Sequence, residues 1–354
     1  MQLKKKCVWR IETVNRPTEL DEKLKIIKRN TEEIVTEKEL IALLEREKSF
    51  KFYHGIAPTG PFHIGYLVPL GKVIDCIKAG GEAIILIADY HAYLDDQKTP
   101  WEKIENRATY CQRCIELTLK DYLDKIEIVR GSTYQTKKEY VEDVFKAAAW
   151  VTIERAKRAA SQVCRMRKPK VSELLYPIMQ VIDVKALGVD MAIGGIDQRH
   201  IYMLGRDVIF PKLGLKPEID IFTPLIASLR KTEEKMSSSI PGSHIKVHDS
   251  PETIITLVSK AYCPPAVSEK NPIIDIAKHI IFPLRGLLYI EREEKYGGPV
   301  EYRNYEKLEN DYINGKLHPR DLKNGVARTL IDMFKDVRKF FEKHEDLLEA
   351  ALVT

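Results

Sequence analysis

Short apolar segments that alternate with longer helical patterns constrain the fold of this chain most strongly. Over roughly the first 230 residues the β-favouring segments are Phe50–Tyr53, Ala83–Ala88, Ile126–Val129, Met191–Ile193 and Ile219–Phe222. The second of these contains no polar residue, as expected of a strand covered on both faces of a parallel sheet. Strands alternating with helices predict an α/β chain with a doubly wound parallel sheet, whose ligands bind at the carboxyl ends of the strands.

Helix signals surround these segments. Asn30 with Glu33, and Thr36 with Glu39, have the spacing of helix N-cap pairs and predict two helices before the first strand. Further helices are predicted over Trp101–Leu123, Lys138–Arg165 and Ser172–Leu187. Residues 1 to about 19 show no clear periodicity, and the lysines Lys4–Lys6 there are expected to be solvated, although they could touch RNA.

The pattern changes at Ser250-Pro251-Glu252, which reads as an N-cap followed by proline at the first helical position. Beyond it the strand signal disappears, and the segment 251–354 is predicted to be a separate, all-helical domain. A chain of 354 residues with 44% hydrophobic residues can hold roughly two to three domains with sizeable cores.

Charge and cysteine content exclude few function classes. A net charge of +5 permits a polyanionic partner without requiring one. Six scattered cysteines, no signal-peptide pattern and no apolar run near 18 residues predict a cytoplasmic chain with free thiols and no membrane segment. Cys111 and Cys114 form a lone CxxC without two further ligands, so we expect ordinary helical cysteines and no metal site.

The stretch from Tyr53 to Tyr66 reads as a strand, a Pro-Thr-Gly-Pro turn and a helix start. Such a turn directs backbone N–H groups and a helix N-terminus beyond the strand end, which favours an anion, and His54 and His63 add ring donors. A phosphate site is therefore predicted, although glycines at strand–turn–helix junctions also serve close packing.

A second stretch, Lys235-Met236-Ser237-Ser238-Ser239, lies in a polar segment that runs from Lys231 to Ser243. A loop of this kind can bring a cation and several hydroxyl donors onto a polyphosphate. A solvated serine loop is the alternative interpretation.

Together, His63-Ile64-Gly65-Tyr66 and the Lys235–Ser239 stretch about 170 residues later resemble the two signature motifs of class I aminoacyl-tRNA synthetases. Tyr176–Gln180, Asp183 and Gly194–Gln198 narrow the resemblance to tyrosyl-tRNA synthetases of the archaeal and eukaryotic type. It extends from about Leu20 to about Lys343. One position departs from the family pattern: Tyr66 stands where a histidine is common, which leaves its effect on ATP affinity open.

This resemblance implies a Rossmann-like catalytic domain that forms tyrosyl-adenylate from L-tyrosine and ATP and transfers the tyrosyl group to tRNA(Tyr). The implied catalytic residues are His63, Lys235, Ser237 and Ser238. The implied ATP-binding residues are Thr59, Gly60, His63, Gly65, Tyr66, Gly195, Asp197, Lys235 and Met236. Mg²⁺ is expected to arrive with ATP, because no dedicated carboxylate cage is evident.

The implied tyrosine-binding residues are Tyr53, Leu86, Tyr134, Gln135, Tyr176, Gln180, Asp183 and Gln198. Three of them, Tyr176, Gln180 and Asp183, are spaced so that they share one face of a helix, and their polar groups can converge there. Tyr53 and Asp183 are implied to bind the phenol hydroxyl. Taken singly, Asp183 could instead be an ordinary surface acid.

For tRNA the resemblance implies contacts from Arg158, Arg199, Tyr296, His318 and Asp321. The first belongs to a basic cluster comprising Arg155, Lys157, Arg158, Arg165, Arg167, Lys168 and Lys170. Such a run can be a solvated face, a site for acceptor-arm phosphates or, by the resemblance, a region near the partner of a homodimer. The last three are implied to read the first anticodon base.

The implied domain order is an N-terminal extension (1–29), a catalytic domain (30–230) with a helical insertion at about 133–189, a mobile loop and linker (231–250) and an anticodon-binding domain (251–354). Two alternatives stay open. A tryptophanyl-tRNA synthetase shares the fold and both motifs, but an indole does not need the pair Tyr53 and Asp183. A non-catalytic RNA-binding relative should have lost phosphate-site residues, whereas His63, Asp197 and Lys235 are present.

Overall fold

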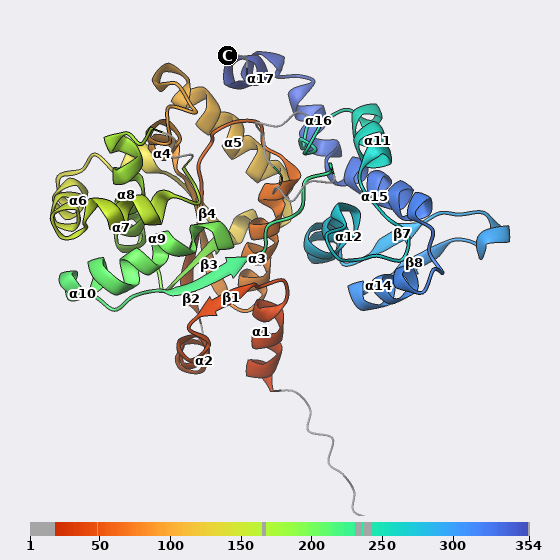
Figure 1. Ribbon diagram of the computed structural model, residues 1–354, viewed down its shortest axis with the longest axis horizontal. Coiled ribbons are helices and arrows are strands. Elements are labelled where there is room, and N and C mark those ends of the chain that lie inside the picture. The colour runs from red at the N-terminus through yellow and green to blue at the C-terminus, as the bar shows by residue number, and fades with distance from the viewer. Residues whose placement is uncertain (1–17, 48, 165–167, 231–235, 237–241, 353–354) are drawn as a thin grey trace, which may run out of the picture.

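The computed structural model describes residues 18–352 apart from 48, 165–167, 231–235 and 237–241. Within that part of the chain, the centre is a six-stranded sheet with the order β1-β6-β5-β2-β3-β4 (Figure 1). The strands are β1 (Glu33–Val35), β2 (Phe50–Ile56), β3 (Gly81–Ile87), β4 (Ile126–Arg130), β5 (Met191–Gly195) and β6 (Ile219–Thr223). Only β1 runs antiparallel to its neighbour. The parallel sheet and all five predicted strands are confirmed.

Helices cover both faces of this sheet, which explains its apolar strands. Alternate residues of β3 point to opposite sides: Ile85 joins an apolar cluster with α3 (Leu67–Lys78) and α5 (Ile104–Thr118), whereas Ile84 joins another with α8 (Val171–Leu187) and α9 (Arg199–Leu204). Cys111 and Cys114 are buried on α5 within the first cluster. Two short helices, α4 (Asp89–Leu94) and α10 (Phe210–Leu213), follow β3 and precede β6.

Of the two helix starts predicted before the first strand, the structure confirms one. Thr36 and Glu39 form the expected capping box at the start of α2 (Glu37–Arg46). No helix begins at Asn30, however. A helix already ends there: α1 (Glu19–Lys28) is capped by Thr18, and Asn30 turns the chain with a φ of 52°. Glu33 then pairs with Phe222 on the edge of the sheet, so this segment is a strand and the helix prediction was wrong.

The helical insertion contains a break that the periodicity concealed. The span predicted as one helix from Lys138 divides into α6 (Lys138–Trp150) and α7 (Ile153–Ala160). Val151 is extended, and the Thr152 hydroxyl accepts from the Arg155 N–H at 3.3 Å, which starts the second helix. Helix α8 continues through Pro177 and ends at Gly188 in the left-handed region.

The C-terminal part is mainly helical, with α11 (Pro251–Lys260), α12 (Pro272–Ile276), α13 (Phe282–Arg285), α14 (Tyr305–Ile313), α15 (Pro319–Met333), α16 (Lys335–Phe341) and α17 (Glu345–Leu352). It also holds a small hairpin of β7 (Leu288–Ile290) and β8 (Val300–Tyr302), which the prediction of an all-helical segment missed. In the part of the chain that the structure describes, no helix is both long and apolar enough to cross a membrane.

Candidate active site

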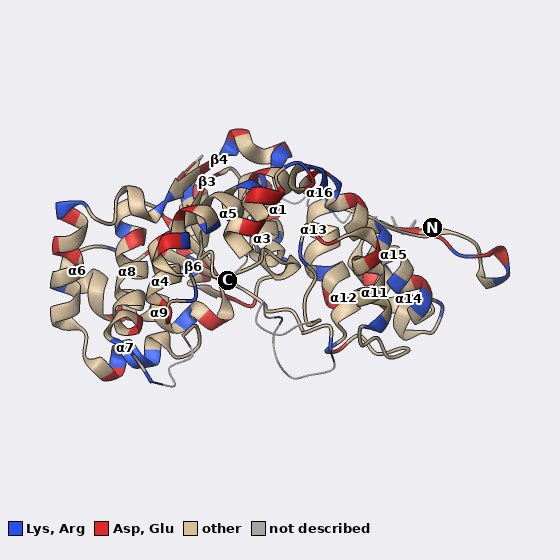
Figure 2. Ribbon diagram, turned by 90° about the horizontal axis from the view of Figure 1, so that it is seen from above, with Lys and Arg blue, Asp and Glu red and all other residues tan. Residues whose placement is uncertain are grey.

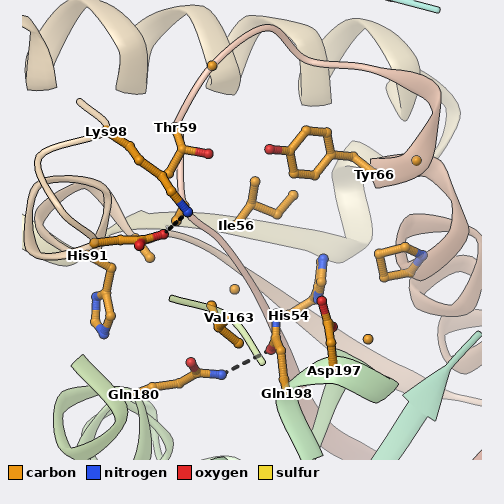
Figure 3. Close-up of a pocket in the computed structure, with 18 of the residues that line it drawn as sticks. His54, Ile56, Thr59, Tyr66, His91, Lys98, Val163, Gln180, Asp197 and Gln198 are labelled. Carbon is orange, nitrogen blue, oxygen red and sulfur yellow. Dashed lines mark hydrogen bonds and ion pairs between the residues drawn. The ribbon is translucent and has the colours of Figure 1, made fainter. Parts of the chain in front are cut away.

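A cavity of about 820 Å³ opens at the carboxyl ends of the parallel strands. Ile56 ends β2, Ala88 follows β3, Gly195 ends β5 and Thr223 ends β6, and all four line the cavity. This is the edge at which ligands of doubly wound sheets bind. Helix α8 and the turn after β2 supply further walls, and Figure 3 shows side chains from both converging on the cavity.

The turn after β2 places His63 against the cavity. Its Nδ1 accepts a hydrogen bond from the Gly65 N–H at 3.1 Å, so the ring proton resides on Nε2. Burial, reinforced by the neighbouring His244, lowers the pKa of His63 to about 3. The imidazole is therefore a neutral donor at physiological pH. His54 differs: its Nδ1 binds the Ile193 carbonyl at 2.9 Å across the sheet, so its cavity-side Nε2 is an acceptor and not the donor that we expected.

Glycine is required at position 65 for a local reason. A Cβ there would lie 2.8 Å from Cε1 of His63 and 3.8 Å from Sδ of Met236. Tyr66 packs its ring 4.6 Å from that of His63, and its hydroxyl is hydrogen-bonded to the Thr59 side chain. The tyrosine that replaces the common histidine thus contacts two other residues of the predicted phosphate site.

The backbone of the first motif pairs with a segment that follows the second motif in sequence. Residue 63 forms a β-bridge with Lys246, flanked by hydrogen bonds from Ile64 N to Ile245 O at 2.9 Å and from Val247 N to Phe62 O at 3.1 Å. Met236 lines the cavity, and its N–H donates to the Ile226 carbonyl at 3.1 Å. Lys235, Ser237 and Ser238 lie outside the described residues. The segment that follows them is anchored next to His63 by the bridge at Lys246.

The acidic end of the cavity is built around Asp183 on α8. This carboxyl is 1% exposed, and its Oδ1 accepts three hydrogen bonds of 2.8 Å, from Tyr134 Oη, Gln135 Nε2 and Tyr140 Oη. Oδ2 has no hydrogen-bond partner among the described residues, and His91 Nε2 is 3.7 Å away. Burial outweighs the three donors and raises the pKa of Asp183 to about 7. A buried acceptor thus faces the cavity with one oxygen available.

Other predicted tyrosine-binding residues surround this carboxyl. Tyr53, Leu86, Tyr176, Gln180 and Gln198 line the cavity together with Asp183. The Tyr53 hydroxyl is 3.0 Å from that of Tyr202, and Gln180 Nε2 donates to Gln198 Oε1 at 3.0 Å (Figure 3). We expected Tyr134 and Gln135 to line the cavity as well, but neither does. Both side chains donate hydrogen bonds to Asp183 instead. Their direct contact with a ligand remains a prediction.

Sequence reasoning gave no role to three residues that shape this end of the cavity. His91 lies edge-on to the ring of Tyr176 at 4.6 Å, Tyr140 donates to Asp183, and Tyr202 pairs with Tyr53. The position of His91 just beyond the end of β3 could have indicated it, since that edge of the sheet carries the site. The two tyrosines had no comparable signal.

At the opposite side Gly195 ends β5 and Asp197 follows it. A Cβ on Gly195 would meet Asp197 Oδ1 at 2.6 Å, so glycine lets that carboxylate fold back over the strand end. Asp197 lines the cavity on the side of His54, as Figure 3 shows.

The predicted tRNA contacts lie elsewhere. Arg158 is on α7, where Figure 2 shows a concentration of Lys and Arg; Arg165 and Arg167 of the basic cluster fall outside the described residues, as do Lys4–Lys6. Arg199 forms a two-pronged pair with Glu33 of β1, with contacts of 2.5 and 2.9 Å. A contact of Arg199 with tRNA would have to share or replace that pair.

The anticodon candidates come together at the far end of the C-terminal part. Tyr296 is 60% exposed in the loop between β7 and β8. Arg292 in the same loop donates to the carbonyls of Gly298 at 2.6 Å and Lys316 at 2.9 Å, which ties the loop to the turn before α15. His318 caps that helix through Nδ1, and Asp321 lies in its first turn.

A parallel sheet with a cavity at its carboxyl edge, lined by His63 of the first motif and Met236 of the second, defines a class I aminoacyl-tRNA synthetase. The family model described as tRNA synthetases class I (W and Y) matches residues 45–335, and the chain belongs to this family.

Within the family, the chain is similar to proteins named for tyrosine. It is 43% identical over 323 residues to the tyrosine–tRNA ligase of Archaeoglobus fulgidus, covering 91% of this chain and 98% of that one. It is 39% identical to the cytoplasmic tyrosine–tRNA ligase of Gallus gallus, over 95% of this chain and 63% of that one. The crystal structure of the A. fulgidus enzyme complexed with L-tyrosine superposes with a TM-score of 0.86, covering 90% and 99% of the two chains. The predicted resemblance to tyrosyl-tRNA synthetases of archaeal and eukaryotic type is thereby confirmed.

Proposed function

We infer that this chain is a tyrosine–tRNA ligase, which forms tyrosyl-adenylate from L-tyrosine and ATP and then loads tRNA(Tyr). The observation that carries the amino-acid choice is the available Oδ2 of Asp183 in a wall that also holds the Tyr53 hydroxyl. A buried carboxylate oxygen without a partner is costly, and a phenol O–H is a donor of the right kind to satisfy it. The relatives of this chain support the same choice, because their names specify tyrosine.

Activation requires the tyrosine carboxylate to attack the α-phosphorus of ATP in line with the leaving pyrophosphate. We propose that Tyr176, Gln180 and Gln198 hold the ammonium and carboxylate, with the phenol directed at Asp183. The Gln180–Gln198 hydrogen bond supports this, since it fixes the two amides beside each other in the cavity wall. Catalysis of this kind consists mostly of positioning and charge stabilisation.

For ATP, we propose that the backbone at Thr59 and Gly60 and the Nε2–H of His63 contact the phosphates, while Asp197 accepts from the ribose hydroxyls. Gly65, Tyr66, Gly195 and Met236 would shape the adenosine site. Lys235, Ser237 and Ser238 are proposed to close over the pyrophosphate. In the second step a hydroxyl of the terminal tRNA ribose attacks the tyrosyl carbonyl carbon, and AMP leaves.

We propose that Mg²⁺ arrives bound to ATP and is not held by a carboxylate cage of the protein. The one cluster of three potential metal ligands among the described residues is Asp95, Cys164 and Glu173. Asp95 is already paired with Lys98 at 2.5 Å, and burial raises the pKa of the Cys164 thiol. Such a set does not suit a hard cation that prefers oxygen ligands. Mg²⁺ bound to ATP would neutralise phosphate charge, and ATP oxygens rather than this cluster would hold it.

We further propose the domain order given by the sequence, a homodimer and a cytoplasmic location. Three large apolar side chains of the insertion support self-association: Phe145, Ile153 and Val171 are 67%, 68% and 82% exposed. The name of the G. gallus relative supports the location. The tRNA contacts of Arg158, Arg199, Tyr296, His318 and Asp321 belong to the same proposal.

ATP–pyrophosphate exchange measured with each of the twenty amino acids tests the function. We expect exchange with tyrosine and at least tenfold less with any other amino acid. Preferential exchange with tryptophan would support the alternative synthetase. Exchange with none of the twenty would leave a non-catalytic RNA-binding protein as the better interpretation.

A further inference from the structure

Helix α5 carries two buried side chains that touch both the predicted ATP loop and the C-terminal helices. Arg107 is 5% exposed and Tyr110 is 1% exposed, and they lie one turn apart. In Figure 1, α5 runs between the sheet and the C-terminal helices α16 and α17. Neither residue carries a role in the function proposed above.

Arg107 joins the loop after β2 to α17. Its Nη1 donates to the carbonyls of Thr59 at 3.2 Å and Lys98 at 2.6 Å and to Thr99 Oγ1 at 2.9 Å. Its Nε donates to the carbonyl of Ala351 in α17 at 2.8 Å. Four acceptors from three segments therefore converge on one guanidinium, whose planar, rigid donors keep them in a fixed relation.

The Thr59 loop receives a second support from the same cluster. Thr99 Oγ1, which accepts from Arg107, donates to the Pro58 carbonyl at 2.6 Å. The carbonyls of two consecutive residues, 58 and 59, are thus fixed directly or through one hydroxyl. These two residues immediately precede Gly60, to which we assign a phosphate contact.

Tyr110 makes the parallel connection one turn later. Its hydroxyl accepts from the N–H of Phe62, the residue before His63, at 2.9 Å. Its ring lies 5.3 Å from that of Phe341 in α16. The loop from Pro58 to His63 is therefore held at both ends by side chains that also contact the C-terminal helices.

Helix α17 also reaches the cavity itself. Leu352 and Arg107 line the same space as Thr59, Gly60 and His63. Ala351 is fully buried where α17 packs on α5. The end of this helix is therefore a wall of the ATP side of the site as well as a partner of Arg107.

We propose that docking of α17 onto α5 sets the position of the ATP-binding loop, with Arg107 and Tyr110 as positioning residues. The inference depends on the proposed assignment of Thr59 and Gly60 to ATP. Undocking α17 would remove one acceptor from a buried guanidinium and let it move, and the Thr59 carbonyl would move with it. ATP binding should weaken, whereas the tyrosine end, built on α8, should not change.

The test uses full-length variants in pyrophosphate exchange. Ala351→Arg forces a charge into the α17–α5 contact, and Glu349→Arg places the same side chain on the exposed face of α17 as its control. Arg107→Lys keeps the positive charge but loses the planar set of guanidinium donors. Tyr110→Phe removes the hydroxyl that accepts from the Phe62 N–H. Asp336→Ala breaks the exposed pair between Lys120, just after the end of α5, and Asp336 in α16, and controls for loss of any interdomain contact.

We expect Ala351→Arg, Arg107→Lys and Tyr110→Phe each to raise the KM for ATP about fivefold or more, in line with loss of one hydrogen bond. Their KM for tyrosine should stay within about twofold of wild type, and both controls should match wild type for both substrates. Thermal unfolding and circular dichroism establish that each variant is folded. Tyr110→Phe, the smallest change, keeps the test decisive if the other two do not fold.

An unchanged KM for ATP in the folded variants would overturn the inference. A parallel rise in both KM values would also overturn it, because that result means general loosening of the fold. Failure of the wild-type chain to exchange with tyrosine would instead refute the proposed function, so the two failures are distinguishable.

Discussion

Replacing Asp183 with asparagine tests the proposal that this carboxylate binds the hydroxyl of the substrate tyrosine. The amide oxygen can take the place of Oδ1 and keep the three donors from Tyr134, Gln135 and Tyr140. The amide nitrogen then stands where Oδ2 was available to the cavity. The variant therefore removes the charged acceptor and leaves its supporting hydrogen bonds in place, which alanine would not do.

The expected magnitude follows from the hydrogen bond that is lost. A hydrogen bond to a charged group contributes about 1.5–3 kcal/mol, and 1.4 kcal/mol corresponds to a factor of ten. The kcat/KM for tyrosine in pyrophosphate exchange should fall by about 10- to 150-fold. Phenylalanine has no hydroxyl to bond to Asp183, so its kcat/KM should stay the same or rise in the variant. The tyrosine-to-phenylalanine ratio should narrow by at least about tenfold.

Asp143→Asn is the matched control. Asp143 is also buried and its partner, Lys185, is on α8, but neither residue lines the cavity. This variant makes the same chemical change at a carboxylate that contacts the same helix. It should leave the tyrosine-to-phenylalanine ratio of kcat/KM within about twofold of wild type. A ratio preserved in folded Asp183→Asn, or narrowed equally in both variants, would show that the hydroxyl is read elsewhere.

Three further outcomes are expected. Lys235→Ala should lower the rate of adenylate formation by roughly 10²-fold or more with tyrosine affinity retained, because a charged donor is lost mainly in the transition state; equal single-turnover rates would remove the role. Asp321→Ala should weaken aminoacylation of tRNA while exchange stays normal, since a single-stranded base is read by edge hydrogen bonds; loss in both assays would indicate misfolding. Burial raises the pKa of Asp183 to about 7, so the ionised acceptor is about 90% populated at pH 8 and about 10% at pH 6; the KM for tyrosine should rise about tenfold as pH falls across that range, and Asp183→Asn should abolish the dependence.

Strands and motifs were predictable because their signals are local. Each predicted strand is rich in β-favouring apolar residues, and in the structure these strands supply residues to the two apolar clusters on either side of the sheet. The stretches Pro58–Gly60 and Lys235–Ser239 could be picked out because each is a pattern of consecutive residues in the sequence. Spacings of four and three residues put Tyr176, Gln180 and Asp183 on one helical face, and all three line the cavity.

Features that depend on distant partners were not predictable. Asn30 and Glu33 have the spacing of a capping pair, but Glu33 lies opposite Phe222, and sheet pairing overrides the local preference. The strands β7 and β8 are three residues each, too short for a periodic signal. The donors to Asp183 come from positions 43 to 49 residues away, and no local rule specifies that distance.

The charges around the cavity bear on the role that we propose for the second motif. Among the described residues that line it, the carboxylates are Asp95, Asp183 and Asp197, and the cations are Lys98 and Arg107. Lys98 is paired with Asp95, and Arg107 is occupied by backbone carbonyls.

His63 cannot supply the missing positive charge, because burial keeps its imidazole neutral with a pKa of about 3. It can offer ATP a hydrogen bond but no charge. A triphosphate with about four negative charges therefore meets a wall with no surplus cation among the described residues. We propose that Mg²⁺ carried by ATP and the Lys235 ammonium balance the charge of the pyrophosphate as it departs, so the loss in Lys235→Ala should appear in the rate of activation and not in tyrosine binding.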